Sequence, residues 1–384
     1  MESAAPSRRG IWSVIGPDGP VWVGIVLVVG VIAAGVGVQA IFPPSPVALF
    51  TMSSSTSMSA ESTSEIGALY EYSYVPAEDL SDEPGSGVIY ALELRGDPLD
   101  LLVSLGELFD VAGQPGQSQY FDEIWPGYVM GPEDWSGPSL NLTWSGTGPW
   151  YYSNPAAYDD PVCSEIPAEE GSEEPGLFEC ESPEPRGPLP SVDEAKALAV
   201  GIFRSSGLDV DVSSIQVLAD DEWGVGVSAL YKVDGVDTAL EWSAFWAPGP
   251  VLASVSGHAA TAVSRGSFAT ISPLQAVSRL DSGQWWGSPP PAYHSSFDEI
   301  FHDEASTSEP IPEPGSLIEI RVESSEVALL LVWDAEFRAW IVPGYVLKHG
   351  PEPWNASAVI SVEEGVIELP DPSDYGIMPL PEVQ

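Results

Sequence analysis

Apolar and polar positions along the chain predict helices that alternate with groups of strands. After Asp97 and Pro98, which suit an N-cap and the first helical position, apolar side chains recur at helical spacing, and this predicts a helix that ends near Gly113. Strand-like runs precede and follow this helix. Residues 66–153 are therefore expected to form a first unit that combines a helix with strands.

Two further segments repeat this order of elements. A capping-box motif opens residues 191–266, and four strand-like runs follow the helix that it predicts. Within these runs, the Asp234-Gly235 step is a strong signal for a two-residue hairpin. A second capping-box motif opens residues 267–369, where strand-like runs again follow. The sequence thus predicts an α+β fold with two or three units, each a helix packed on an antiparallel sheet.

Segments of linker composition separate these units. Residues 43–65 are rich in Ser, Thr and Pro, and residues 154–190 are acidic and Pro-rich. A Pro-rich insert at residues 288–315 interrupts the last unit, and an acidic Pro-rich tail occupies residues 370–384. Such compositions are typical of linkers rather than of packed cores.

An uncharged apolar stretch precedes the predicted units. Residues 21–42 are 22 residues without a charge, long enough as a helix to cross a hydrocarbon core of about 30 Å. Arg8 and Arg9 lie before it, so residues 1–20 are expected to form a short cytoplasmic tail. The sequence predicts a single-pass signal anchor in the cell membrane with the bulk of the chain outside the cytoplasm. The alternative is a secreted protein, cleaved from its signal peptide near Ala40.

The balance of charge excludes some partners. The chain has 57 acidic and 12 basic residues among 384, a formal net charge of -45. Nucleic acid is excluded as a partner because binding phosphates requires clustered Lys and Arg. With so many carboxylates, pairs at catalytic distance arise by chance, so they give no signal of a hydrolase.

The two cysteines predict a disulfide. Cys163 and Cys180 enclose 16 residues, and an even pair in an oxidising compartment is expected to form a bond. Zinc is disfavoured, because no CxxC motif accompanies them.

Aromatic residues near the end of the first unit suggest a ligand surface. Trp144, Trp150, Tyr151 and Tyr152 resemble the side chains that a carbohydrate-stacking face or a peptide groove uses. The alternative is that they fill the core.

One ligand-rich cluster suggests a metal site. His294, Asp298 and His302 would share a helix face at i, i+4 and i+8 and could hold a divalent ion. The alternative is a solvated linker, because the cluster follows three prolines and lacks the HExxH order of a zinc protease.

Three features of the later units carry a resemblance to known proteins. They are the helix-then-meander unit with its hairpin at residues 231–236, the Val255-Ser256-Gly257 step, and residues 339–345, AWIVPGY. In these features, residues 191–369 resemble a group of uncharacterised, membrane-anchored extracytoplasmic proteins of high-GC Gram-positive (actinobacterial) bacteria, whose units are similar in layout to PepSY-type regulatory domains. The resemblance implies a non-catalytic binding or inhibitory module, with no catalytic residue.

These observations predict a non-catalytic, membrane-anchored binding or regulatory protein that engages another protein of the cell envelope. A cell-wall carbohydrate-binding protein is the alternative. A secreted hydrolase with carboxylate chemistry is the least favoured, because no motif places an acid and a base together. The sequence has no GxSxG, P-loop or dinucleotide fingerprint, and no cofactor is expected.

Overall fold

The structure is a computed structural model, and the residues that it describes lie within one compact unit, Ala48–Gln384. They are residues 48–53, 71–121, 125–134, 136–159, 162–166, 177–181, 184, 186–293, 317–349 and 356–370.

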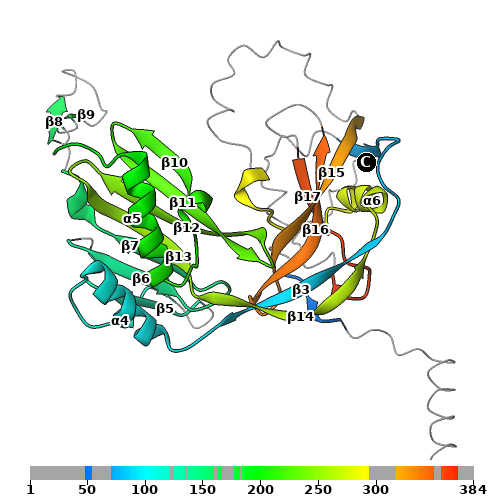
Figure 1. Ribbon diagram of the computed structural model, residues 1–384, viewed down its shortest axis with the longest axis horizontal. Helices are drawn as coiled ribbons and strands as arrows, with labels where there is room; N and C mark the ends of the chain where they lie inside the picture. The colour runs from blue at the N-terminus through cyan, green and yellow to red at the C-terminus, as the bar shows by residue number, and fades with distance from the viewer. Residues whose placement is uncertain are drawn as a thin grey trace, which may run out of the picture. The chain divides into compact units, whose positions relative to one another are not determined.

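The largest sheet has eight strands in the order β10-β11-β12-β13-β7-β6-β5-β4, and every neighbouring pair is antiparallel (Figure 1). Four strands come from the first predicted unit and four from the second. The pairing of β7 with β13 joins the two sets, and Trp150 lies opposite Gly257 there. The strands are β4 (Gly116–Gln117), β5 (Gly127–Met130), β6 (Ser139–Thr143), β7 (Pro149–Ser153), β10 (Gln216–Asp221), β11 (Gly224–Val233), β12 (Val236–Ala247) and β13 (Val251–His258).

The second sheet has six strands, in the order β14-β3-β16-β15-β2 with β17 also paired to β16. Its strands too come from distant parts of the chain, since β3 pairs with both β14 and β16. The pairing of β15 with β2 is parallel. The strands are β2 (Glu71–Pro76), β3 (Gly85–Leu94), β14 (Ala260–Thr270), β15 (Leu317–Trp333), β16 (Ala339–His349) and β17 (Ala356–Ile360).

Two smaller pairings complete the strands of the described residues. The short β1 (Phe50–Thr51) is parallel to β18 (Ile367–Glu368), and β8 (Val162–Ile166) is antiparallel to β9 (Leu177–Glu181).

The predicted helix starts are confirmed by their caps. The side chain of Asp97 caps α4 (Pro98–Phe109), and full capping boxes at Ser191 and Ser272 begin α5 (Val192–Ser205) and α6 (Pro273–Ser282). The first helix ends earlier than predicted, because Asp110 adopts the left-handed conformation with φ 53° and closes it. Short 3-10 helices are η1 (Pro155–Ala157), η2 (Val212–Ser214) and η3 (Pro291–Tyr293).

The predicted hairpin at Asp234-Gly235 is also confirmed. Val233 pairs with Val236, and both turn residues have positive φ, 50° and 82°. Two successive residues with positive φ are what a tight hairpin turn between twisted strands requires.

Helices α4 and α5 pack on the same face of the eight-stranded sheet (Figure 1). The apolar side chains of α4 and α5 are buried against the sheet, and this burial is the main contribution of the two helices to stability. Helix α6 packs instead in a second core with the six-stranded sheet. The first core contains Leu102, Leu105 and Phe109 of α4, Ala195, Ala199 and Phe203 of α5, and Leu140, Leu142, Trp150, Tyr152, Trp242 and Val255 of the sheet.

The predicted fold class was wrong. The described residues are mostly β, with sheets of eight and six strands and three α-helices, rather than two or three units of a helix on its own antiparallel sheet. The alternation of apolar and polar residues indicates which face a strand buries. It does not indicate the partner strand, and here the partners lie in different parts of the chain.

The predicted location as a single-pass membrane protein is likewise corrected. Among the described residues, no helix is long and apolar enough to cross a membrane. The helices α4, α5 and α6 have 12, 14 and 10 residues. The stretch at residues 21–42 and the cleavage site near Ala40 lie outside the described residues.

Candidate functional site

The four aromatic residues singled out in the sequence do not share one surface. Trp150 and Tyr152 point from β7 into the core, where both rings pack against Phe109 of α4, with centroid distances of 6.1 and 4.6 Å. Trp144 packs partly buried against the same core. Tyr151 points to the opposite side of β7 and is 42% exposed. Alternation along the strand thus leaves Tyr151 as the exposed member of the neighbouring residues 150–152.

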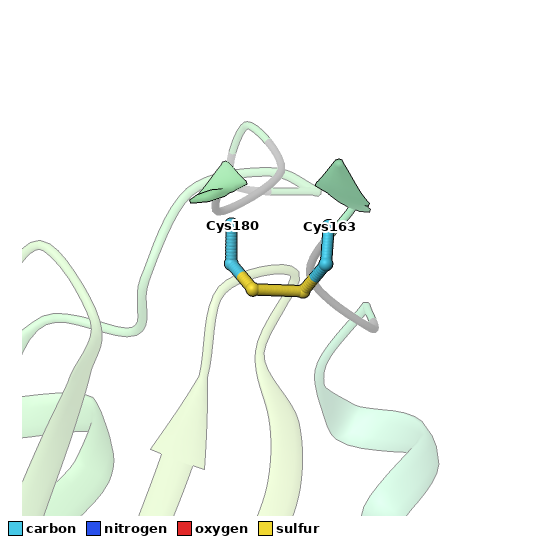
Figure 2. The surroundings of a disulfide bond; sticks show 2 residues. All are labelled: Cys163 and Cys180. Carbon is cyan, nitrogen blue, oxygen red and sulfur yellow. A yellow bond between two sulfur atoms is a disulfide. The ribbon is translucent and has the colours of Figure 1, made fainter. Parts of the chain in front are cut away.

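The predicted disulfide is confirmed. Cys163 of β8 and Cys180 of β9 lie directly opposite each other in this two-stranded ribbon, and Figure 2 shows the bond between their sulfur atoms. Stable disulfides are typical of proteins outside the reducing cytoplasm.

The proposed metal ligands cannot be placed. His294, Asp298 and His302 lie outside the described residues. Within the part of the chain that the structure describes, no group of three or more His, Cys, Asp or Glu side chains is arranged to hold a metal ion.

The face of the eight-stranded sheet opposite α4 and α5, here called the helix-free face, carries a row of uncharged polar side chains. Ser243, Ser256, Tyr151 and Asn141 are successive cross-strand partners on β12, β13, β7 and β6. The hydroxyls of Ser243 and Ser256 lie 2.8 Å apart. All four side chains are at least partly exposed, so the row is available to a ligand.

A cavity of about 260 Å³ lies at the β4–β6 end of this face. We call it the β4–β6 pocket. Two of its residues, Ser139 and Asn141, alternate on β6 with the core residues Leu140 and Leu142 and hence lie on the helix-free side. The complete lining in the described residues is Ser118, Tyr120, Phe121, Pro132, Glu133, Ser139 and Asn141.

Local contacts fix the geometry of the pocket. The buried hydroxyl of Ser118 donates to Glu133 Oε2 over 3.3 Å and accepts from the backbone N–H of Tyr120 at the same distance. The ring of Phe121 rests on Gly127, where an added Cβ would lie 2.1 Å from a ring carbon. Glycine at this position therefore lets the aromatic ring lie against β5.

The other conspicuous surface is the outer strand of the sheet. Among the described residues, β10 pairs with β11 alone, so one of its backbone edges carries no strand there. Its neighbouring residues Val217 and Leu218 are both exposed, as is Trp223 in the turn that follows. We call Gln216–Asp221 the β10 edge.

The two described histidines each lie within hydrogen-bonding distance of a side-chain hydroxyl. His258 Nδ1 lies 2.9 Å from Thr147 Oγ1, and burial lowers the pKa of His258 to about 4. His349 Nε2 lies 2.7 Å from Ser357 Oγ, and burial lowers the pKa of His349 too. Among the described residues, no carboxylate hydrogen-bonds to the other ring nitrogen of His349, the contact that orients the base in a catalytic triad. The pair bridges β16 and β17 instead.

The sequence led us to expect exposed strand edges as a contact surface but did not indicate which strand forms the edge, and it gave no sign of the β4–β6 pocket. Asn141 could have been found, because the pattern SLNLT places one amide between two apolar residues of a strand. Ser118, Phe121 and Glu133 carry no such signal, since they come together only through the turns that flank β4 and β5.

Comparisons with known proteins are sparse. No protein-family model and no curated protein matches the chain. The chain is similar to an uncharacterised protein from Eubacterium rectale ATCC 33656, known from a crystal structure, with 11% sequence identity and a TM-score of 0.36 over 76% of this chain and 87% of that one. So distant a likeness carries no argument about function. The resemblance to uncharacterised membrane-anchored actinobacterial proteins stays a prediction, but the PepSY-like layout of its units was wrong, because the strands form two sheets shared between distant parts of the chain.

Proposed function

We propose that the protein is a non-catalytic binding protein that works outside the reducing cytoplasm and engages a partner protein through the β10 edge. The observation that carries this proposal is that β10 ends the eight-stranded sheet and pairs on one side only within the described residues. An edge strand presents unpaired N–H and C=O groups, to which an extended segment of another protein can add as a further strand. The disulfide between Cys163 and Cys180 supports a location outside the reducing cytoplasm, because stable disulfides are typical of oxidising compartments.

The side chains of β10 offer specificity as well as backbone pairing. Val217 and Leu218 are 42% and 55% exposed, and they lie at the register shift between Val217 and Ala219. An added strand would therefore meet two exposed apolar side chains. Burial of such side chains would stabilise the complex by on the order of 1 kcal/mol or more each.

Charge indicates the chemistry of the partner. Asp220, Asp221 and Glu222 end the strand and begin the turn, and the whole chain has a net charge of -45. Acidic residues and the register shift between Val217 and Ala219 are devices that disfavour pairing between edges of two copies of the same chain. A segment that combines apolar residues with Lys or Arg complements this edge, and opposite charge also speeds association.

A selection experiment tests the proposal. Ten-residue peptides displayed on phage would be selected on the full chain, and we expect enrichment of sequences that alternate apolar residues with Lys or Arg. Hydrogen exchange with an enriched peptide should then protect backbone amides of the β10 edge. Enrichment of acidic sequences, or protection confined to other strands, would contradict the proposal.

Matched substitutions localise the contact. Val217→Glu and Leu218→Glu should weaken binding of the enriched peptide at least tenfold. The control is Val236→Glu, because Val236 is similarly exposed at 46% but lies at the β11–β12 hairpin of the same sheet. Equal losses in all three variants would show that binding depends on net charge rather than on the β10 edge.

A further inference from the structure

The β4–β6 pocket combines three kinds of side chain that a single ligand could use. It offers aromatic rings from Tyr120 and Phe121, the amide of Asn141 with two serine hydroxyls, and the carboxylate of Glu133. Its volume of about 260 Å³ lies just below the range of most ligand pockets, roughly 300 to 1,000 Å³. We propose that this pocket binds one ring of a neutral oligosaccharide, a function separate from the β10 edge.

The hydrogen-bonding groups match a sugar. Ser139 and Asn141 can each both donate and accept, and Glu133 accepts, whereas the hydroxyl of Ser118 already donates to Glu133 and holds it in place. Neighbouring hydroxyls of a sugar ring likewise donate and accept, so a ring in the pocket can satisfy both kinds of group. Ser139 is buried, and a ligand hydroxyl that pairs with it gains from the low dielectric around it.

The aromatic groups supply the apolar part of the site. Phe121 is 39% exposed although one side of its ring rests on Gly127, and Tyr120 is exposed further still. The C–H face of a sugar ring is apolar and can cover such a ring, which removes apolar surface from water.

The charge and the hydrogen-bond donors of the pocket favour a neutral sugar over an anionic ligand and over an ammonium ligand. Glu133 disfavours an anionic ligand. An ammonium group could pair with Glu133 and the aromatic rings, but it only donates hydrogen bonds, so the donors of Asn141 and Ser139 would gain nothing from it. A neutral polyhydroxylated ligand is the class that uses all of these groups.

The surface beside the pocket extends the site. Tyr151 lies directly opposite Asn141 on β7, and its ring is exposed on the same face of the sheet. The next sugar ring of an oligosaccharide could therefore stack on Tyr151 while the first occupies the pocket. Tyr151 is one of the aromatic residues for which the sequence suggested a carbohydrate role.

Titration calorimetry with the full chain tests the proposal. The probes are cellotriose, maltotriose, xylotriose and triacetylchitotriose, with tetramethylammonium as the cationic comparison. We expect at least one trisaccharide to bind and tetramethylammonium not to compete with it. Failure of all four trisaccharides to bind, or their displacement by tetramethylammonium, would overturn the proposal.

Substitutions then place the bound sugar. Phe121→Ala and Asn141→Ala should each weaken binding at least tenfold, and Gly127→Ala should act like Phe121→Ala because its methyl group displaces the ring. Tyr120→Ala, at a highly exposed position that the fold does not need, should weaken binding severalfold. Tyr72→Ala is the control, since Tyr72 is 43% exposed on β2 of the other sheet.

Trisaccharide binding in the β4–β6 pocket can be tested separately from peptide binding at the β10 edge. Val217→Glu should leave the affinity for the trisaccharide unchanged, whereas Phe121→Ala should leave peptide binding at the β10 edge unchanged. Unaltered trisaccharide binding in Phe121→Ala, Asn141→Ala and Tyr120→Ala would place the sugar elsewhere and refute this inference.

Discussion

Tyr90 of β3 donates a hydrogen bond to Oδ2 of Asp234 over 2.5 Å. Asp234 lies at the tip of the β11–β12 hairpin, so this bond ties the six-stranded sheet to the eight-stranded one. This bond links two residues that 143 others separate in sequence, and it adds to the packing of β12 with β15 between the same two sheets.

We expect Tyr90→Phe to lower the free energy of unfolding by about 1–2 kcal/mol at pH 7, because the hydrogen bond to a carboxylate is lost. Burial, followed by the contact with Asp234, raises the pKa of Tyr90 to about 12. The wild type therefore loses this stabilisation as the pH rises from about 10 to 12, and the difference from Tyr90→Phe should narrow. Urea unfolding at pH 7 and pH 11 measures the difference in the free energy of unfolding between wild type and Tyr90→Phe. Tyr120→Phe is the control at an exposed tyrosine.

Asp334 is a fully buried carboxylate with several donors. It accepts hydrogen bonds from Arg338 Nε at 2.7 Å, Trp340 Nε1 at 2.9 Å, and the backbone N–H groups of Glu336 and Arg338. Asp334→Asn should cost about 3 kcal/mol or more, because its NH₂ group would face donors. Glu336→Gln also removes a carboxylate that contacts Arg338, but at an exposed position, and should cost less than about 1 kcal/mol. Similar costs in urea unfolding would contradict the assigned role of Asp334.

Gly257 allows close contact between two core tryptophans. An added Cβ would lie 2.4 Å from Trp242 Nε1 and 2.5 Å from Trp150 Cζ2, and neither ring can move without disturbing the core. Gly257→Ala should therefore destabilise the protein by about 1–3 kcal/mol. Gly201→Ala should instead stabilise it by roughly 0.5–1 kcal/mol, because Gly201 is exposed inside α5 and its Cβ would meet nothing. Thermal unfolding of both variants should show shifts of opposite sign.

His258 should make stability depend on pH. Burial lowers its pKa to about 4, whereas in the unfolded chain it titrates near 6.5. Between these values the unfolded state binds the proton, so the wild type should lose up to about 3 kcal/mol as the pH falls from 6.5 to 4. Many carboxylates titrate in the same range, so the measurement is the difference between wild type and His258→Gln in urea unfolding. Parallel profiles of the two proteins would contradict the prediction.

The local structure was predictable where a single residue type determines the backbone conformation, as at helix caps and tight turns. Asp97, Ser191 and Ser272 each cap a helix as expected, and Asp234-Gly235 forms the expected turn. These signals depend on interactions between residues that lie close together in sequence, so the sequence alone is enough to predict them.

The pairing of strands was not predictable in this way. The second expected unit contains β10 to β13, but β13 pairs with β7 of the first. The strand pattern is the same whichever neighbour a strand has, so a unit that looked complete in the sequence is half of a larger sheet.

The candidate sites also depend on how the strands pair and on which side of a strand each residue lies. Trp150, Tyr151 and Tyr152 form one aromatic run in the sequence, yet the pleat of β7 sends Tyr151 to one side and its neighbours to the other. Phe121 and Asn141 are 20 residues apart in the sequence and meet in one pocket because β4, β5 and β6 are adjacent.

The crossing of strands between distant segments also governs the order in which the protein can be assembled during synthesis. When β3 leaves the ribosome, its main partner β14 has yet to be translated, and β14 begins at Ala260, 166 residues after β3 ends at Leu94. A nascent chain that stops before Ala260 would hold every strand of the eight-stranded sheet together with α4 and α5, but only β2 and β3 of the six-stranded sheet. The eight-stranded sheet can therefore form first, whereas β3 lacks its strand partners until β14 and β16 have been made, and a chaperone that shields unpaired strands would act there.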